Sequence, residues 1–278
     1  IKNGASVSDP SAGTGGFLVT VMKEFPNLNL SFFGDEIDQT MASIANANMA
    51  LHGYRNAVRR RDALEIDDED VDIVLANPPF AGRISSKSKL ATEVKSTKTE
   101  VLFLDLIMKR VKPGGWASVI VPISVLTNND SGTKSVRKML FKEGGVRAVV
   151  ELPSGVFRPY TDVRTAIIFW QKGISHSEVH LWKIDSDGFS LDDKRKPLEF
   201  SDLHKIQPEI YAICNEMPEN FTSKIIGSDV FSSGESSMLP SRYIETQRDS
   251  VANANFAGLV EKIDDEVRSL LKSLESLK

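Results

Sequence analysis

The sequence has a single cysteine, Cys214, in 278 residues. One thiol cannot form an internal disulfide, and chains so poor in cysteine are typical of a reducing compartment. Apolar runs long enough to span a bilayer are missing, and the first residues lack the apolar core of a signal peptide. We therefore expect a soluble protein of the cytoplasm with no membrane partner.

Positive charge is not in excess. The 34 lysines and arginines are outnumbered by 38 aspartates and glutamates, which gives a formal net charge of −4. This balance argues against a protein that coats nucleic acid through its overall field, so any polyanionic partner requires a local site. With 41% hydrophobic and 26% charged residues, the composition is that of a globular chain and excludes the disordered and fibrous classes.

Segments with strand and helix patterns alternate through the first part of the chain. The expected strands are residues 5–9, 28–36, 71–76, 116–122, 146–152 and 163–170, and the expected helices are 15–25, 38–52, 100–111 and 132–142. This alternation predicts an α/β fold of the Rossmann-like type, a doubly wound and mostly parallel sheet covered on both faces. No helical pattern joins the last two strands, so we expect them to form an antiparallel hairpin at the sheet edge.

Three parts are expected along the chain: a first domain of residues 1–175, a small α/β extension of residues 176–250 with no assigned role, and a C-terminal helix of residues 251–278. In the helix, apolar residues recur at alternating four- and three-residue steps, as in the seam of a coiled coil. They are Phe256, Val260, Ile263, Val267, Leu270, Leu274 and Leu277. Such a stripe can dock on the protein's own core or on helices of another subunit.

Two groups of polar residues are expected at the surface without a chemical role. His176 and His180 lack further ligands at metal-binding spacing, so no metal site is predicted. Four arginines are expected along an exposed edge of the sheet: Arg55, Arg59, Arg60 and Arg61.

A glycine-rich stretch, "SDPSAGTGGFL", lies between the first strand and the first helix, where doubly wound sheets open their ligand crevice. Gly13 and Gly15 allow a ligand to approach the backbone closely. Asp9 closes this strand and Glu36 closes the next, about twenty residues beyond the glycines, where such folds bind ribose hydroxyls. Two carboxylates and the Gly-x-Gly-Gly spacing favour a nucleoside with a sulfonium and an amino acid group over a dinucleotide. A tight turn that binds no ligand is the alternative.

Asp62 follows the basic stretch Arg59-Arg60-Arg61, just beyond a short third strand expected between the helix 38–52 and the strand 71–76. From that position its carboxylate could reach the adenine of such a nucleoside. A helix-capping or surface aspartate is the alternative.

The strand 71–76 ends at Asn77-Pro78-Pro79-Phe80. Proline has no N–H to donate to a sheet ladder, so two consecutive prolines must lie past the end of the strand. The stretch therefore presents an amide side chain and an aromatic ring on a stiff turn.

The order "DPSAGTGGFL", "GDEID" and then "NPPF" resembles the S-adenosylmethionine-dependent amino-group DNA methyltransferases, in particular the modification subunit of type I restriction-modification systems. The stretches "ANANMALHG", "FLDLIMKRVKPGGWASVIVP" and "VVELPSGVFRPYTDVRTAIIFWQKG" are similar too, so the likeness covers roughly residues 5–175. In that family an aromatic segment and a helical domain precede the glycine loop. We therefore expect this chain to lack an N-terminal region.

The resemblance implies S-adenosylmethionine as the cofactor. Asp9, Gly13 and Gly15 would bind its methionine end, Glu36 its ribose and Asp62 its adenine. Phe17 could pack against that pocket or belong to the core.

The resemblance also implies the roles of the turn. In the family the asparagine oxygen and the carbonyl of the first proline accept the hydrogens of the target amine, roles that Asn77 and Pro78 would fill. Phe80 would stack on a base that has left the duplex. Asparagine at the first position favours adenine N6 over cytosine N4.

DNA and further subunits are the partners that the resemblance implies. The basic residues Arg83, Lys87 and Lys89 follow the turn and could track DNA phosphates, or lie in a solvated loop. The helix 251–278 would pack against a specificity subunit that reads the DNA sequence, and a restriction subunit is a further candidate partner.

Two other functions remain open. A protein glutamine N5-methyltransferase also uses Asn-Pro-Pro and an aromatic residue, because an amide nitrogen poses the same geometric problem; the long continuation of this chain beyond the sheet argues against it. The other is a catalytically silent scaffold with a methyltransferase fold, which the intact Asp9, Glu36 and Asn77 make less attractive.

Overall fold

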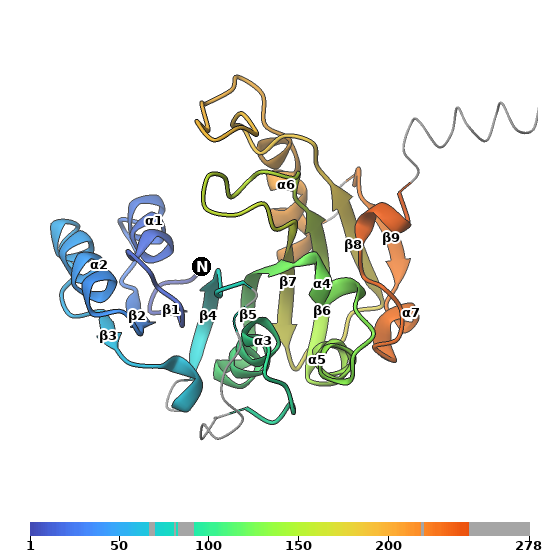
Figure 1. Ribbon diagram of the computed structural model, residues 1–278, viewed down its shortest axis with the longest axis horizontal. Coiled ribbons are helices and arrows are strands. Elements are labelled where there is room, and N and C mark those ends of the chain that lie inside the picture. The colour runs from blue at the N-terminus through green and yellow to red at the C-terminus, as the bar shows by residue number, and fades with distance from the viewer. Residues whose placement is uncertain (67–69, 81, 83–91, 218–219, 245–278) are drawn as a thin grey trace, which may run out of the picture. The chain divides into compact units, whose positions relative to one another are not determined.

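The computed structural model describes residues 1–66, 70–80, 82, 92–217 and 220–244. The compact unit Ile1–Pro240 contains one mixed sheet of nine strands in the order β3-β2-β1-β4-β5-β7-β6-β8-β9 (Figure 1). The strands are β1 (Ser6–Asp9), β2 (Ser31–Glu36), β3 (Val58–Arg60), β4 (Val71–Ala76), β5 (Val111–Pro122), β6 (Gly144–Glu151), β7 (Thr165–Lys172), β8 (Glu178–Lys183) and β9 (Lys224–Gly227). The expected C-terminal helix, residues 251–278, lies outside the described residues.

Neighbouring strands from β3 to β5 are parallel, so their carboxyl ends lie along one edge of the sheet. Strand β7 is antiparallel to both β5 and β6, which confirms the predicted hairpin. The expectation that this hairpin forms the sheet edge is wrong, because β8 pairs in parallel with β6 and β9 pairs with β8. These added strands come from residues 176–250, whose short segments gave no sign of joining the same sheet.

Two histidines, His176 just before β8 and His180 within it, correct a second expectation. His176 and His180 are buried, with 7% and 4% of their surface exposed, and do not lie at the surface. His180 donates to or accepts from the Ser223 hydroxyl at 2.9 Å and stacks on Trp182, because β8 is an inner strand. Burial and the charge of Arg147 lower the pKa of His176 to about 4. No group of metal-ligating side chains occurs among the described residues.

The helices are α1 (Gly16–Glu24), α2 (Gln39–Leu51), α3 (Thr99–Arg110), α4 (Ile123–Thr127), α5 (Ser131–Lys142), α6 (Asp202–Cys214) and α7 (Asp229–Ser232), with short 3-10 turns η1 (Ala63–Glu65) and η2 (Pro240–Arg242). Side chains that accept from the first turn explain where several begin: Asp38 caps α2 and Asp130 caps α5. Within the part of the chain that the structure describes, none of these helices has the length and hydropathy to cross a membrane.

Helices cover both faces of the sheet (Figure 1). Leu75, Ser118, Phe169 and Ala148 are successive cross-strand partners and therefore share one face. On that face Leu75 packs against the cluster under α1 and α2, and Phe169 packs against the cluster under α6. Helix α3 buries Leu102 and Leu106 against η1 in a separate cluster.

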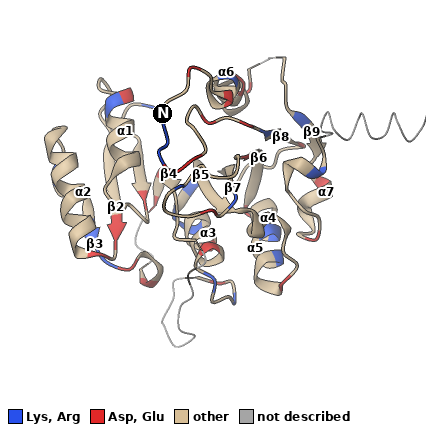
Figure 2. Ribbon diagram, turned by 45° about the horizontal axis from the view of Figure 1, so that its top comes forward, with Lys and Arg blue, Asp and Glu red and all other residues tan. Residues whose placement is uncertain are grey.

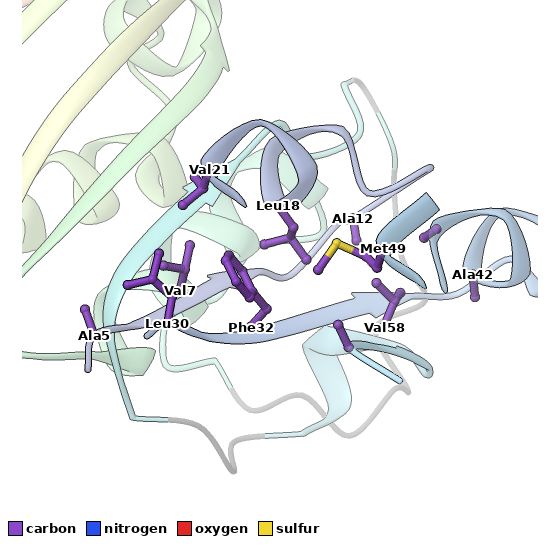
Figure 3. Close-up of a cluster of buried hydrophobic side chains, with 12 residues drawn as sticks. Ala5, Val7, Ala12, Leu18, Val21, Leu30, Phe32, Ala42, Met49 and Val58 are labelled. Atoms are coloured by element: carbon purple, nitrogen blue, oxygen red, sulfur yellow. The ribbon is translucent and has the colours of Figure 1, made fainter. Parts of the chain in front are cut away.

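A cluster of buried side chains holds β1 and β2 against α1 and α2 (Figure 3). Val7, Leu18 and Met49 are fully inaccessible to solvent, and burial of side chains of this size stabilises the fold by about 1.5–3 kcal/mol each. The packing leaves no room at Gly34 of β2, where an added Cβ would lie 2.8 Å from Val58 Cγ2 and 3.2 Å from Ala12 Cβ. The glycine loop thus rests directly on β2.

Candidate functional site

The carboxyl edge of the parallel strands brings the predicted polar residues together. Asp9 ends β1, Glu36 ends β2, Asp62 follows β3 and Asn77 follows β4. Because Ser8 pairs with Val74, Asp9 is level with Leu75, and Asn77 lies two residues further, about 7 Å along the neighbouring strand. Acidic residues are visible at the tip of the β2 arrow in Figure 2. The four residues therefore share the edge at which the sequence predicts a ligand crevice.

The glycine loop is built from left-handed backbone. Gly13 has φ 55° and Gly15 has φ 79°, values that side chains rarely adopt. A Cβ added at Gly13 would have no atom within 4 Å, so open space lies in front of it. Gly15 precedes α1, which begins without a side-chain cap. The loop therefore offers space to a ligand in front of Gly13, and the first turn of α1 offers N–H groups that no side chain caps.

Glu36 is fixed by the loop that it faces. Its Oε2 accepts from the Gly13 N–H at 2.9 Å, and its Oε1 accepts from the Asp38 N–H at 2.8 Å. Each carboxylate oxygen has a second lone pair. The side chain is thus oriented by the backbone and keeps capacity to accept from hydroxyl groups.

Asp9 is a buried carboxyl group, with 2% of its surface exposed. Its Oδ1 accepts from the Ser11 N–H at 3.0 Å and from the Ser11 hydroxyl at 3.3 Å. Burial raises the pKa of Asp9 to about 7, with the Ser11 hydrogen bonds opposing the shift and the charges of Glu36 and Asp35 adding to it. A group that titrates near neutrality in a crevice is a candidate binding residue.

A buried ion-pair network beneath the crevice was not anticipated from the sequence. Asp35, 1% exposed, pairs with Arg61 Nε at 2.6 Å and with Arg110 Nη1 at 2.7 Å. Arg110 also donates to the carbonyls of Ala63 and Ile66. The expectation of an exposed edge is therefore wrong for Arg61, whose side chain is only 14% exposed. In the sequence, the acidic stretch "GDEID" and the basic stretch "RRRD" are the only hint of this ion-pair network.

Asp62 lies one strand beyond Glu36. Its Oδ1 accepts from the Leu64 N–H at 3.0 Å and caps the turn η1, so the capping alternative describes its contacts. It is partly exposed at the site edge. A role toward an adenine ring remains a proposal.

The Asn-Pro-Pro-Phe turn carries an unusual polar atom. Asn77 Oδ1 is buried and has no hydrogen-bond partner among the described residues. Leaving a buried acceptor unpaired costs about 1–3 kcal/mol, so such an atom in a stiff turn points to a donor that binds there. Pro78 is buried, whereas Pro79 is exposed.

Phe157 is a residue of this edge that sequence reasoning missed. It lies in the connection between β6 and β7, and its ring meets the ring of Phe80 edge to face, with centroids 5.5 Å apart and planes at 73°. For the stretch "PSGVFRPYTD" the sequence predicts only a non-helical link between two strands. The contact between this connection and the turn joins residues far apart in the sequence, so the spacing of residues in the chain does not predict it.

Three predicted nucleic-acid-binding residues, Arg83, Lys87 and Lys89, lie outside the described residues. Their place relative to the turn stays a prediction from the sequence.

The chain is similar to a family of DNA methylases and to methylase subunits of type I restriction enzymes. Residues 1–251 match the family described as N-6 DNA Methylase. The type I restriction enzyme EcoEI methylase subunit of Escherichia coli is 32% identical over 222 residues, which are 73% of this chain and 45% of that protein. The EcoKI methylase subunit of Escherichia coli strain K12 is 28% identical over 192 residues, 60% of this chain and 36% of that protein. The chain thus spans less than half the length of these two curated relatives.

Solved structures show the same architecture. A structure described under complex assembly and conformational transition of the type I R-M system has a TM-score of 0.70 and 27% identity, covering 99% of this chain and 62% of that one. The crystal structure of the EcoKI M protein has a TM-score of 0.72 at 20% identity, covering 95% of this chain and 68% of that one, and supports the fold. The Rossmann-like α/β fold is confirmed. By the match over residues 1–251, the chain belongs to the N-6 DNA methylase family.

Proposed function

We propose that this chain is the catalytic part of a type I modification subunit, an S-adenosylmethionine-dependent DNA methyltransferase specific for adenine N6. The observation that carries the proposal is Asn77 Oδ1, which is buried without a partner among the described residues, on a proline turn at the same sheet edge as the glycine loop and two carboxylates. Membership of the N-6 DNA methylase family supports it.

The crevice fits S-adenosylmethionine. Open space at Gly13 and the left-handed Gly15 suit the methionine end, with Asp9 as the partner of its ammonium group. Glu36 keeps acceptor capacity for the ribose hydroxyls, and Asp62 lies on the adenine side. When bound, this cofactor supplies an electrophilic methyl group on a sulfonium.

The pKa of Asp9 predicts a pH dependence of cofactor binding. Because the pKa is raised to about 7, the carboxyl becomes increasingly protonated below that pH and loses its attraction for an ammonium group. Affinity for S-adenosylmethionine, measured by calorimetry, is expected to fall about tenfold from pH 8 to pH 6. Asp9→Asn should bind more weakly with a flatter pH profile; identical profiles for the two proteins would contradict the assignment.

The turn would prepare the target amine. An exocyclic amine is a poor nucleophile because its lone pair is delocalised into the base. Asn77 Oδ1 and the Pro78 carbonyl would accept its two hydrogens, and no donor to either oxygen is found within the described residues. The prolines fix φ, so these acceptors need little rearrangement during the reaction.

Phe80 and Phe157 would hold the base once it has left the duplex. Their edge-to-face contact places two rings at the turn, and stacking on an aromatic ring contributes about 1–3 kcal/mol per base toward the cost of extrusion. A covalent intermediate on cysteine is disfavoured, because Cys214, the only cysteine in the sequence, lies at the end of α6 and not in the turn, and burial raises its pKa to about 11.

The partners are proposals of the same kind. Double-stranded DNA would be held in part by Arg83, Lys87 and Lys89, and a specificity subunit would be held by the helix 251–278. A restriction subunit could join, and the complex would work in the cytoplasm. The relatives named as type I methylase subunits support this assignment.

A methyl-transfer assay tests the function. The full-length protein with its partner subunits is incubated with tritium-labelled S-adenosylmethionine and either unmethylated DNA, fully N6-methylated DNA or a release-factor protein that presents a glutamine. We expect label in the unmethylated DNA alone. Label in the protein would favour the glutamine methyltransferase, and cofactor binding without transfer to either substrate would favour the silent scaffold.

A further inference from the structure

We propose that Thr99 is a positioning residue for methyl transfer, because its hydroxyl fastens the Asn-Pro-Pro-Phe turn to the first residue of α3. The inference rests on the proposed function of that turn. Thr99 does not touch the reacting atoms in this account and acts through the backbone that carries Asn77 and Pro78.

Thr99 forms hydrogen bonds to two residues of the turn and its continuation, Pro79 and Gly82. The Thr99 hydroxyl donates to the carbonyl of Pro79 at 3.0 Å, with the Gly82 carbonyl at 3.3 Å and Glu100 Oε2 at 3.4 Å as longer, weaker alternatives. The Thr99 backbone N–H donates to the same Gly82 carbonyl at 3.1 Å. Thr99 therefore holds the backbone on either side of Phe80.

Thr99 and Gly82 are also closely packed against each other. A Cβ added at Gly82 would lie 2.7 Å from Thr99 Oγ1 and 2.8 Å from Thr99 Cγ2. A residue with a side chain would displace the threonine or the turn. Glycine at position 82 therefore lets the turn approach α3 this closely.

Apart from the contact of Phe80 with Phe157, few interactions among the described residues orient the turn. Pro78 and Pro79 have no N–H to donate, and within the described residues no donor reaches Asn77 Oδ1 or the Pro78 carbonyl. Because Thr99 takes the carbonyl of Pro79, the carbonyl of Pro78 stays free for a substrate. The direction of both proposed acceptors is thus set by the backbone that Thr99 holds.

Helix α3 is a firm support for this contact. Its residues Val101, Leu102 and Leu104 are buried in the core. Asp105, fully buried in the same helix, accepts from the N–H groups of Glu93 and Val94 at 2.5 Å and 2.6 Å, which ties down the chain that leads into α3. A site supported by a packed helix keeps its geometry better than one supported by a loop.

Thr99→Val tests the proposal, with Thr99→Ser as the matched variant. Valine keeps the shape of threonine and removes the hydroxyl, whereas serine keeps the hydroxyl and removes the methyl group. In the full-length complex we expect Thr99→Val to lower kcat for DNA methylation about tenfold, since one hydrogen bond that fixes the acceptors is lost. Affinity for S-adenosylmethionine and KM for DNA should change by less than about twofold, and Thr99→Ser should keep most of the wild-type kcat.

A second variant acts on the same contact from the other side. Gly82→Ala should lower kcat in the same way while the protein still binds S-adenosylmethionine, which reports that the fold is intact. An unchanged kcat in Thr99→Val, an equal fall in Thr99→Ser, or a parallel loss of cofactor affinity would overturn the inference. If the unsubstituted complex fails to methylate DNA, the proposed function fails and this inference with it; active wild type with unaffected variants refutes the inference alone.

Discussion

Replacing Asn77 by alanine is expected to lower kcat for DNA methylation by about 100- to 1,000-fold, the loss typical of removing one preorganised polar group from a reaction centre. Asn77 Oδ1 is buried without a partner among the described residues, so its removal takes away the acceptor for the target amine without breaking a hydrogen bond of that oxygen to those residues. Tritium-methyl transfer by the full-length complex measures this effect. Affinity for S-adenosylmethionine should stay unchanged, because the crevice residues are on other strands.

Asn27→Ala is the matched control. Asn27 is exposed in the connection between α1 and β2, at the opposite edge of the sheet. Its loss should leave both turnover and cofactor affinity unchanged. Normal turnover in Asn77→Ala would refute the role assigned to the turn, and a loss of cofactor binding would indicate a general disturbance of the site.

Replacing Asp35 by alanine is expected to lower the free energy of unfolding by about 3–5 kcal/mol, because a buried positive charge loses its partner. Arg110 is fully buried and its Nη1 lies 2.7 Å from Asp35 Oδ2. Urea denaturation at neutral pH measures the change. The network joins β2, η1 and α3 below the crevice, so weaker cofactor binding should accompany the loss.

Two further variants separate the buried pair from ion pairs in general. Glu235 forms an exposed pair with Lys134, its side chain being 64% exposed, and Glu235→Ala should change stability by less than about 1 kcal/mol. Adding Arg110→Met to Asp35→Ala should recover part of the lost stability, because the unpaired buried charge is removed with its partner. No recovery in the double variant would show that the loss comes from packing, or from Arg59 and Arg61, which also pair with Asp35.

Local elements were predicted well where a pattern of nearby residues decides them. Strand β4 has the predicted bounds, residues 71–76, because an apolar run ends at two prolines. Helices α1, α2, α3 and α5 begin and end within a residue or so of the predicted positions, since caps and glycines mark their ends. Strand β5 begins earlier than predicted, at Val111, where its pairing with β4 has a register shift.

Contacts between distant segments were not predicted. Phe157 meets Phe80, Thr99 meets Pro79, and Asp35 meets Arg110 across long stretches of chain. The sequence predicts the hairpin at the sheet edge and His180 at the surface because the pairing of β8 with β6 leaves no local signature. The position of the hairpin and the burial of His180 both depend on which strands pair in the folded sheet.

The sequence by itself determined the order of strands and helices and the residues at the strand ends, because short-range periodicity, prolines and glycines act within a few residues. Parallel strands then require Asp9, Glu36 and Asn77 to share one edge. The tertiary structure alone decided what surrounds them: the second ring at Phe80, the anchor at Thr99, the charges beneath Glu36, and the burial that brings the pKa of Asp9 to about 7. Burial and long-range contact are properties of the packed chain, so no local pattern of residues encodes them.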